Sequence, residues 1–185
     1  MIICICGKSG SGKSTIAKKI QEERPNSIHI DIDKIGHMSH SDETVKKKLI
    51  DSFGKIILTN NNIDRKKLGK IVFSSKDEMK KLEIITWSYM EQEIDKIIEN
   101  NKDKIIILDY LLLPRTKYFN NCDLRILVDI PYEIRKERVM KRDNISEERF
   151  NLRESSSIDY DKTSFDIVLS NEDTKDIKRK VLKYE

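Results

Sequence analysis

One run of eight residues near the N-terminus constrains this chain more than any other feature. Residues 7–14 are Gly7-Lys8-Ser9-Gly10-Ser11-Gly12-Lys13-Ser14, which match the phosphate-loop pattern in full. Glycines let the backbone curl so that successive N–H groups point inward, where they and the start of the next helix bind an anion. The run follows a short apolar segment, residues 2–6, and precedes a helical pattern over residues 13–23. The motif requires this order of strand, loop and helix, which disfavours a chance glycine-rich turn.

The polar groups of this loop predict a binding site for ATP and Mg²⁺. Lys13 is expected to reach the β- and γ-phosphates as a point charge, and the Ser14 hydroxyl is expected to coordinate the metal ion. The other predicted nucleotide contacts come from the same loop and the first helical turn: Gly7, Lys8, Ser9, Gly10, Ser11, Gly12 and Thr15. We therefore expect a small kinase that uses Mg-ATP.

The chain alternates between apolar segments and helical patterns, which predicts a parallel sheet in a three-layer α/β/α fold. Five segments have the composition of buried strands: residues 2–6, 27–32, 104–109, 124–130 and 165–169. The stretch from about 42 to 100 carries no strand signal, so we expect a helical insertion there, between core segments 1–41 and 101–185. A basic helix is expected to close the chain. The predicted unit is one P-loop kinase fold of 185 residues with a five-stranded parallel sheet.

Three aspartates are predicted to lie where strands end, which is the edge at which an open parallel sheet binds ligands. Asp31 and Asp33 come at the end of the second predicted strand, and Asp109 ends the third. Asp33 is the candidate that orients or deprotonates the acceptor hydroxyl. Asp31 is expected either beside Mg²⁺ or as a helix cap. Asp109 is expected either to help hold Mg²⁺ through water or to be an ordinary carboxylate at a strand-end turn.

Two consecutive helical patterns carry arginines, which predicts a small helical lid at about residues 135–160. Arg138 and Arg142 lie four residues apart on one helix face, and Arg153 follows on the second helix. Phosphoryl transfer needs positive charge where the transferring group becomes more negative, so these three arginines are candidate catalytic residues. The alternative is a solvated basic face that pairs with nearby acidic side chains: Glu133, Glu137 and Glu148.

Several longer segments carry a more specific pattern than the phosphate loop. They are Phe53-Gly54-Lys55-Ile56, residues 63–73, the helical pattern from Lys76, Asp31-Ile32-Asp33, and the lid arginines with Arg142-Asp143. With these segments the chain resembles the dephospho-CoA kinase family. The resemblance implies that the insertion binds CoA, that Asp33 acts near the acceptor hydroxyl, and that Asn171 lies near adenine. It also implies transfer of the ATP γ-phosphoryl group to the ribose 3′-hydroxyl of dephospho-CoA, giving CoA and ADP.

The chain departs from that family's pattern at several positions. Trp87-Ser88 stands where the family has His-Pro, and His37 where it has an arginine. Residues 109–115 replace the family's Asp-x-Pro-Leu-Leu-x-Glu, and Arg135 and Ser157 replace two glutamines. Two alternatives therefore stay open. One is a nucleoside or nucleoside-monophosphate kinase, and the other is a degenerate nucleotide-binding homologue without catalysis.

Composition and charge limit the partners. Net charge is +4, with 36 basic and 32 acidic residues mixed along the chain, which suits a small polyanionic substrate and does not favour nucleic acid. The three cysteines are expected to be small buried side chains in a reduced compartment. The apolar runs are too short to span a bilayer and no signal segment precedes the first strand, so we expect a cytoplasmic protein without a membrane partner. The sequence makes no prediction of the oligomeric state.

Overall fold

The computed structural model describes residues 1–155 and 157–170, so the predicted C-terminal basic helix lies outside the described residues. The chain divides into two compact units. The first unit joins Met1–Asp31 to the chain from Asn100 onward, and the second is Ile32–Glu99. Each unit has its own hydrophobic core.

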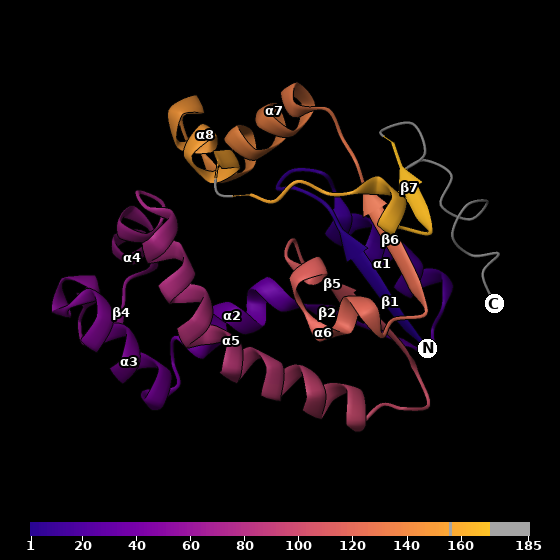
Figure 1. Ribbon diagram of the computed structural model, residues 1–185, viewed down its shortest axis with the longest axis horizontal. Coiled ribbons are helices and arrows are strands. Elements are labelled where there is room, and N and C mark those ends of the chain that lie inside the picture. The colour runs from indigo at the N-terminus through magenta and orange to yellow at the C-terminus, as the bar shows by residue number, and fades with distance from the viewer. Residues whose placement is uncertain (156, 171–185) are drawn as a thin grey trace. The chain divides into compact units, whose positions relative to one another are not determined.

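The first unit is built on a five-stranded sheet, and every neighbouring pair of its strands is parallel. The strand order is β2-β5-β1-β6-β7 (Figure 1). The bounds are β1 Ile2–Cys6, β2 Ser27–Asp31, β5 Ile105–Asp109, β6 Leu124–Val128 and β7 Ile167–Leu169. This arrangement confirms the predicted fold class. Because β1 is the central strand, the loop that follows it begins beside the carboxyl ends of β5 and β6.

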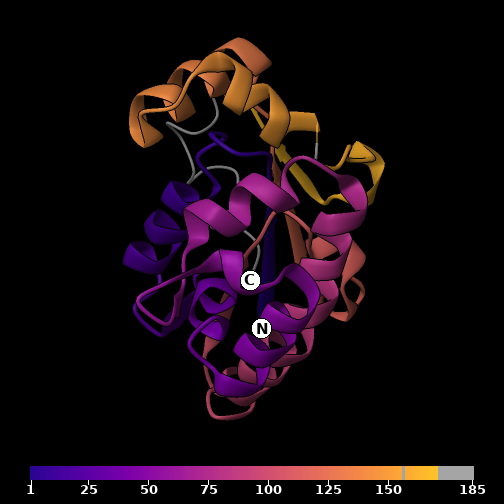
Figure 2. The same cartoon turned by 90° about the vertical axis from the view of Figure 1, so that its left-hand side faces the viewer.

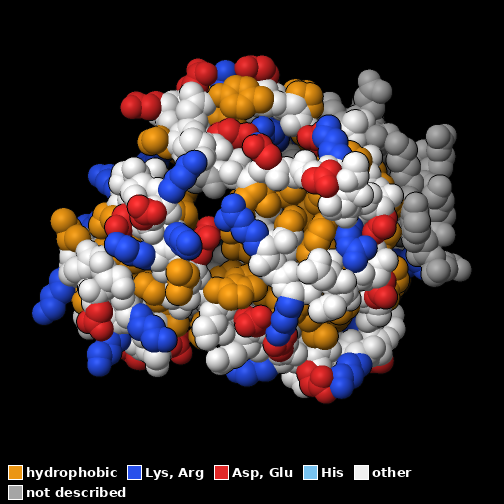
Figure 3. Space-filling model, viewed as in Figure 1, with side chains coloured by type: hydrophobic (Ala, Val, Ile, Leu, Met, Phe, Trp, Pro, Cys, Tyr) orange, Lys and Arg blue, Asp and Glu red, His pale blue; other side chains and the backbone are white. Residues whose placement is uncertain are grey.

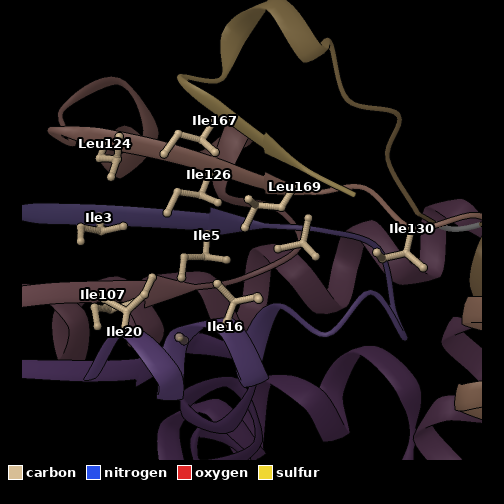
Figure 4. Packing of buried hydrophobic residues seen from close by; sticks show 12 residues of the cluster. Ile3, Ile5, Ile16, Ile20, Ile107, Leu124, Ile126, Ile130, Ile167 and Leu169 are labelled. Carbon is tan, nitrogen blue, oxygen red and sulfur yellow. The ribbon is translucent and has the colours of Figure 1, made fainter. Parts of the chain in front are cut away.

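The core of the first unit explains why β1 and the phosphate loop hold their place. Ile3 and Ile5 of β1 point to one side of the sheet, where Ile16 and Ile20 of α1 (Lys13–Glu23) pack against them (Figure 4). Ile16 and Ile20 lie four residues apart on one helix face, and both are 1 % exposed. Burial of one such side chain stabilises the fold by about 1.5–3 kcal/mol. The start of α1 is therefore fixed against the sheet.

Five helical elements complete the described part of the first unit after β5. They are the 3-10 helix Leu113–Arg115, α6 Lys117–Asn120, the lid helices α7 Tyr132–Asp143 and α8 Glu147–Ser155, and the 3-10 helix Lys162–Ser164. Helices α7 and α8 lie side by side (Figures 1 and 2). An edge-to-face contact between Tyr132 of α7 and Phe150 of α8, with ring centroids 5.5 Å apart, joins them. Phe150 is fully buried, so it is the main apolar anchor of α8.

The second unit is mostly helical and begins directly after β2. Its elements are α2 Ile32–Ser39, α3 Glu43–Phe53, the 3-10 helix Lys55–Ile57, β3 Leu58–Thr59, β4 Asn62–Ile63, α4 Arg65–Val72 and α5 Lys76–Glu99. Asp42 caps α3 by accepting a hydrogen bond from Val45 N at 3.0 Å, and Asp64 caps α4 by accepting from Lys66 N at 2.9 Å. The core of this unit comprises Val45, Leu49, Phe53, Ile57, Leu68 and Val72.

The expectation of no strand between residues 42 and 100 was wrong. Leu58 pairs with Ile63 and Thr59 pairs with Asn62 in a two-residue antiparallel hairpin. Asn60 and Asn61 both have positive φ, of 49° and 62°, as a tight hairpin turn requires. Strands of two residues are too short to show alternation, so the sequence pattern does not reveal them. The second predicted strand was also one residue too long, because Ile32 already belongs to α2.

Candidate active site

The phosphate loop joins β1 to α1 with the backbone shape that its glycines permit. Gly10 and Gly12 have φ values of +80° and +91°, in the left-handed region that favours glycine. The Ser11 N–H donates to Lys8 O at 3.0 Å, and the Ile16 N–H donates to Gly12 O at 3.0 Å, which starts α1. Gly12 is the N-cap of α1 and offers no side chain to the first N–H groups. These groups and the positive end of the helix dipole can therefore bind a phosphate.

Gly10 also lets the loop approach lid helix α7 closely. A Cβ atom at Gly10 would lie 2.7 Å from Arg135 O and 2.8 Å from Val139 Cγ2. By contrast, nothing lies within 4 Å of a Cβ atom built on Gly12. Of these two glycines, only Gly10 lies against α7.

Gly10→Ala is expected to destabilise the fold more than Gly12→Ala does. Both variants force an alanine to positive φ, which costs about 1–2 kcal/mol. Only Gly10→Ala also pushes α7 away from the loop, so it should lower the unfolding temperature further and weaken ATP binding. Thermal unfolding and calorimetric ATP titration measure the two effects, with Gly12→Ala as the matched control. Equal losses in the two variants would contradict the role of the α7 contact.

Asp109 ends β5 and lies at the buried edge of the site. Its Cα is the register partner of Asp31 on β2, so two of the predicted carboxylates meet at the ends of neighbouring strands. Asp109 is 1 % exposed, and its Oδ2 lies 3.2 Å from His29 Nε2. Among residues 1–155 and 157–170, Oδ1 of Asp109 has no hydrogen-bond partner. This oxygen is therefore available to accept a hydrogen bond from a metal-bound water.

This donor set fits magnesium better than a structural zinc ion. Within the described residues, no group of three or more His, Cys, Asp or Glu side chains is placed to hold a metal. Mg²⁺ is usually held by one or two carboxylates together with waters and substrate phosphates. Ser14 in the first turn of α1, Asp31 and Asp109 supply that kind of ligand.

The lid brings two of the three predicted catalytic arginines to the phosphate loop. Arg138 Nη1 donates to Gly10 O at 3.5 Å. A cavity of about 340 Å³ lies beside the loop and is lined by Gly10, Ser11, Gly12, Thr15, Ile16, Lys19, Arg138 and Arg142. This cavity combines loop backbone with positive side chains from α1 and α7. It can therefore accept a polyphosphate.

Asp143 links Arg142 to Arg153, the third predicted catalytic arginine. Arg142 makes two hydrogen bonds to its carboxylate, at 2.8 and 3.2 Å, and Arg153 of α8 donates to the same carboxylate. The hydrogen bonds from Arg142 and, to a smaller extent, from Arg153 hold the pKa of Asp143 below its usual value. They outweigh the effect of partial burial, which raises it. The predicted alternative named Glu133, Glu137 and Glu148 as the partners of this face, whereas Arg142 and Arg153 pair with Asp143.

Arg135 is held inside the lid, and its side chain contacts the backbone of the loop. It is 5 % exposed, and its Nη1 and Nη2 donate to both Glu154 oxygens at 2.8 and 2.7 Å. Nη1 also donates to Ser9 O at 3.4 Å. Lys8 Nζ lies 3.4 Å from Glu154 Oε1 and 2.9 Å from Asp159 Oδ1. Burial raises the pKa of Glu154, but the Arg135 and Lys8 charges outweigh it and hold that pKa below its usual value. Glu154 thus joins the lid to the loop.

Comparison with known proteins decides the family. The family model described as Dephospho-CoA kinase matches residues 1–176. The chain belongs to the dephospho-CoA kinase family. It is 40% identical over 154 residues to the dephospho-CoA kinase of Aquifex aeolicus, covering 82% of this chain and 77% of that protein.

Two solved structures share the fold of this dephospho-CoA kinase family member. A Thermus thermophilus protein is similar with a TM-score of 0.81 and 25% identity, over 99% of this chain and 96% of that one. The dephospho-CoA kinase from Campylobacter jejuni is similar with a TM-score of 0.58 and 25% identity, over 98% and 94%. The predicted family resemblance and the predicted kinase activity class are therefore confirmed.

The other residues singled out in the sequence of this dephospho-CoA kinase family member lie in the second unit or outside the described residues. Asp33 is an exposed residue in the first turn of α2, and His37 is exposed in the last turn of the same helix. Trp87 is a half-buried residue of α5. Asn171 lies outside the described residues.

Sequence reasoning missed a tyrosine that supports the loop of this dephospho-CoA kinase family member. The Tyr160 hydroxyl accepts a hydrogen bond from Gly7 N at 3.2 Å and donates to Leu111 O at 2.8 Å. It therefore ties the first residue of the phosphate loop to the segment after Asp109. Because 153 residues separate Tyr160 from Gly7 along the chain, no local pattern signals this contact.

Tyr160→Phe is expected to raise the KM for ATP about threefold to tenfold, because loss of one such hydrogen bond is worth about 0.5–1.5 kcal/mol. The ring contact with Phe165, with centroids 5.8 Å apart, should survive. Steady-state kinetics measure the change. The control is Tyr132→Phe, which removes a hydroxyl that donates to Asn151 within the lid. If both variants shift the KM equally, Tyr160 has no specific effect on the loop.

Proposed function

We propose that this chain transfers the γ-phosphoryl group of ATP to the ribose 3′-hydroxyl of dephospho-CoA, giving CoA and ADP. The family match over residues 1–176 carries the proposal. The phosphate loop and the buried Asp109 follow neighbouring parallel strands, and Arg138 and Arg142 line the cavity beside the loop. Groups of this kind support a role in phosphoryl transfer. Two lines of support, one from relatives and one from geometry, therefore agree.

Charge stabilisation and positioning account for the catalysis. The loop amides and the start of α1 bind the phosphates, and Lys13 adds a positive charge at the β- and γ-phosphates. Arg138 borders the cavity beside the loop and is the lid group best placed for the transferring phosphoryl group. Arg142 and Arg153 share Asp143, which holds their guanidinium groups together. We assign all three arginines to stabilising negative charge in the transition state.

Magnesium is the proposed metal, held by Ser14, Asp109 and Asp31. The partnerless Oδ1 of Asp109 supports this assignment, since a metal-bound water would satisfy it. When bound, the ion neutralises charge on the β- and γ-phosphate oxygens. Asp109 would hold a metal-bound water from its buried position, and Ser14 would contribute its hydroxyl from the first turn of α1.

Asp33 is the proposed residue that orients the acceptor hydroxyl and takes its proton. It follows β2 by two residues and belongs to the helical unit that the family resemblance connects with CoA binding. An exposed carboxylate in a first helical turn is accessible to a substrate. The altered positions Trp87, His37 and Arg135 leave this assignment unchanged, because Asp33 itself matches the family pattern.

The proposed reaction takes place in the cytoplasm with small-molecule substrates. The three cysteines are unpaired and buried, as suits a reducing compartment. None of the helices in residues 1–155 and 157–170 is both long enough and apolar enough to cross a membrane. On the face shown in Figure 3, basic and acidic side chains are interspersed, which does not favour nucleic acid.

Product analysis tests the proposal. The purified chain is incubated with Mg-ATP and dephospho-CoA, and the product is examined by mass spectrometry and phosphorus NMR. We expect a single added phosphate on the ribose 3′-oxygen and one ADP for each product. Phosphate on any other oxygen, or ADP without phosphorylated acceptor, would contradict the proposed function.

A further inference from the structure

A buried histidine contacts the proposed metal carboxylate and has no role so far. His29 lies on β2, two residues before Asp31, so both side chains are on the same face of the sheet. The β2–β5 register sets Asp31 against Asp109. The His29 side chain is only 8% exposed, and its Nε2 lies 3.2 Å from Asp109 Oδ2.

The chemistry of the pair fixes the direction of this hydrogen bond. An ionised carboxylate only accepts, so we assign the hydrogen to His29 Nε2, which then donates to Oδ2. This bond occupies one Asp109 oxygen, whereas Oδ1 has no partner among the described residues. The two oxygens of one buried carboxylate are thus different. His29 holds one of them, and no residue in the described part of the chain holds the other.

We propose that His29 is a positioning residue for Asp109. By holding Oδ2, it fixes the rotation of the carboxylate so that Oδ1 faces the water shell of the bound magnesium. This inference rests on the proposed function, in which Asp109 helps to hold Mg²⁺. Partners of this outer-shell kind typically change metal affinity or activity by about 10–100-fold when they are removed.

A purely structural role for His29 predicts something different. If the bond only satisfies a buried carboxylate, its loss lowers stability and leaves the effect of Mg²⁺ on nucleotide binding unchanged. If the bond positions Asp109, its loss reduces the gain in ADP affinity that Mg²⁺ produces, while ADP binding without metal stays the same. The ratio of ADP affinities with and without Mg²⁺ therefore separates the two roles, independently of catalysis.

The experiment is calorimetric titration of ADP into the full chain, with Mg²⁺ and with EDTA, for the natural sequence and three variants. His29→Leu removes the donor at similar size and should reduce the Mg²⁺-dependent gain about tenfold, at the lower end of the outer-shell range. His29→Gln places an amide donor at the position of Nε2 and should restore most of the gain. Asp109→Asn should reduce the gain at least as much as His29→Leu.

The outcomes distinguish this inference from the proposed function. If Asp109→Asn lowers the gain and His29→Leu does not, the positioning role is wrong and the metal assignment of Asp109 stands. If Asp109→Asn leaves the gain intact, the metal assignment fails and the role of His29 fails with it. If the His29→Leu protein does not fold, His29→Asn takes its place. The asparagine side chain is shorter, so its amide donor does not reach Asp109 Oδ2. Recovery by His29→Gln, with loss in the leucine or asparagine variant, supports the proposal.

Discussion

Lys13→Ala is expected to reduce kcat by at least about 100-fold, because a preorganised group that stabilises transition-state charge is worth about 10²–10³ in rate. Lys13 is the first residue of α1 and is only partly buried, so its side chain contributes little to the core. The fold should therefore survive with an almost unchanged unfolding temperature. Coupled detection of ADP gives kcat and KM, and thermal unfolding verifies that the variant is folded.

The matched control for Lys13→Ala is Lys18→Ala, which removes the same charge from an exposed position on the same helix. Its kcat should stay within about twofold of the natural value, since exposed charges at a distance are screened by water and salt. A fully active Lys13→Ala protein would contradict the assignment of residues 7–14 as the ATP phosphate site. A large loss in both variants would point to a general effect of charge on α1.

Asp33→Asn is expected to lower kcat by about 10²–10⁴, the range for loss of a general base, and to change ATP affinity much less. Asparagine keeps the shape of the side chain but cannot accept a proton from the acceptor hydroxyl. The comparison requires steady-state kinetics with both substrates and a separate ATP titration. A kcat loss without loss of ATP affinity is the pattern of an interaction made in the transition state.

Asp51→Asn is the matched control for Asp33→Asn, because Asp51 is an exposed aspartate on α3 in the same unit. It should leave both kcat and ATP affinity unchanged. Equal losses of kcat and ATP affinity in Asp33→Asn would assign Asp33 to metal binding instead of acceptor activation. Full activity would remove Asp33 from the catalytic site.

The sheet and the phosphate loop are predictable because their signals are local. A buried strand such as Ile2–Cys6 is continuously apolar, and the glycine spacing after it is required by the backbone shape, with positive φ at Gly10 and Gly12. The same holds for Asp109, which ends an apolar run and lies at the carboxyl edge of the sheet. In each of these cases the residues that decide the structure are neighbours in sequence.

The missed features depend on contacts between distant parts of the chain. Glu154 lies 19 residues from Arg135, and their pairing satisfies a lid arginine that is buried in the structure. The bond between His29 and Asp109 spans 80 residues and exists only because β2 and β5 are neighbours. Strand order is a property of the whole sheet, and the pairing of two helices depends on how they pack, so neither contact has a local sequence signal.

The most direct test of the central claim is ADP release from Mg-ATP with a panel of acceptors. The panel contains dephospho-CoA, the common nucleoside monophosphates, nucleosides, and a sample without acceptor. The proposed function predicts that dephospho-CoA alone stimulates ADP release above the acceptor-free rate. Stimulation by a nucleoside or nucleoside monophosphate instead, or no stimulation by any acceptor although ATP binds, would contradict it.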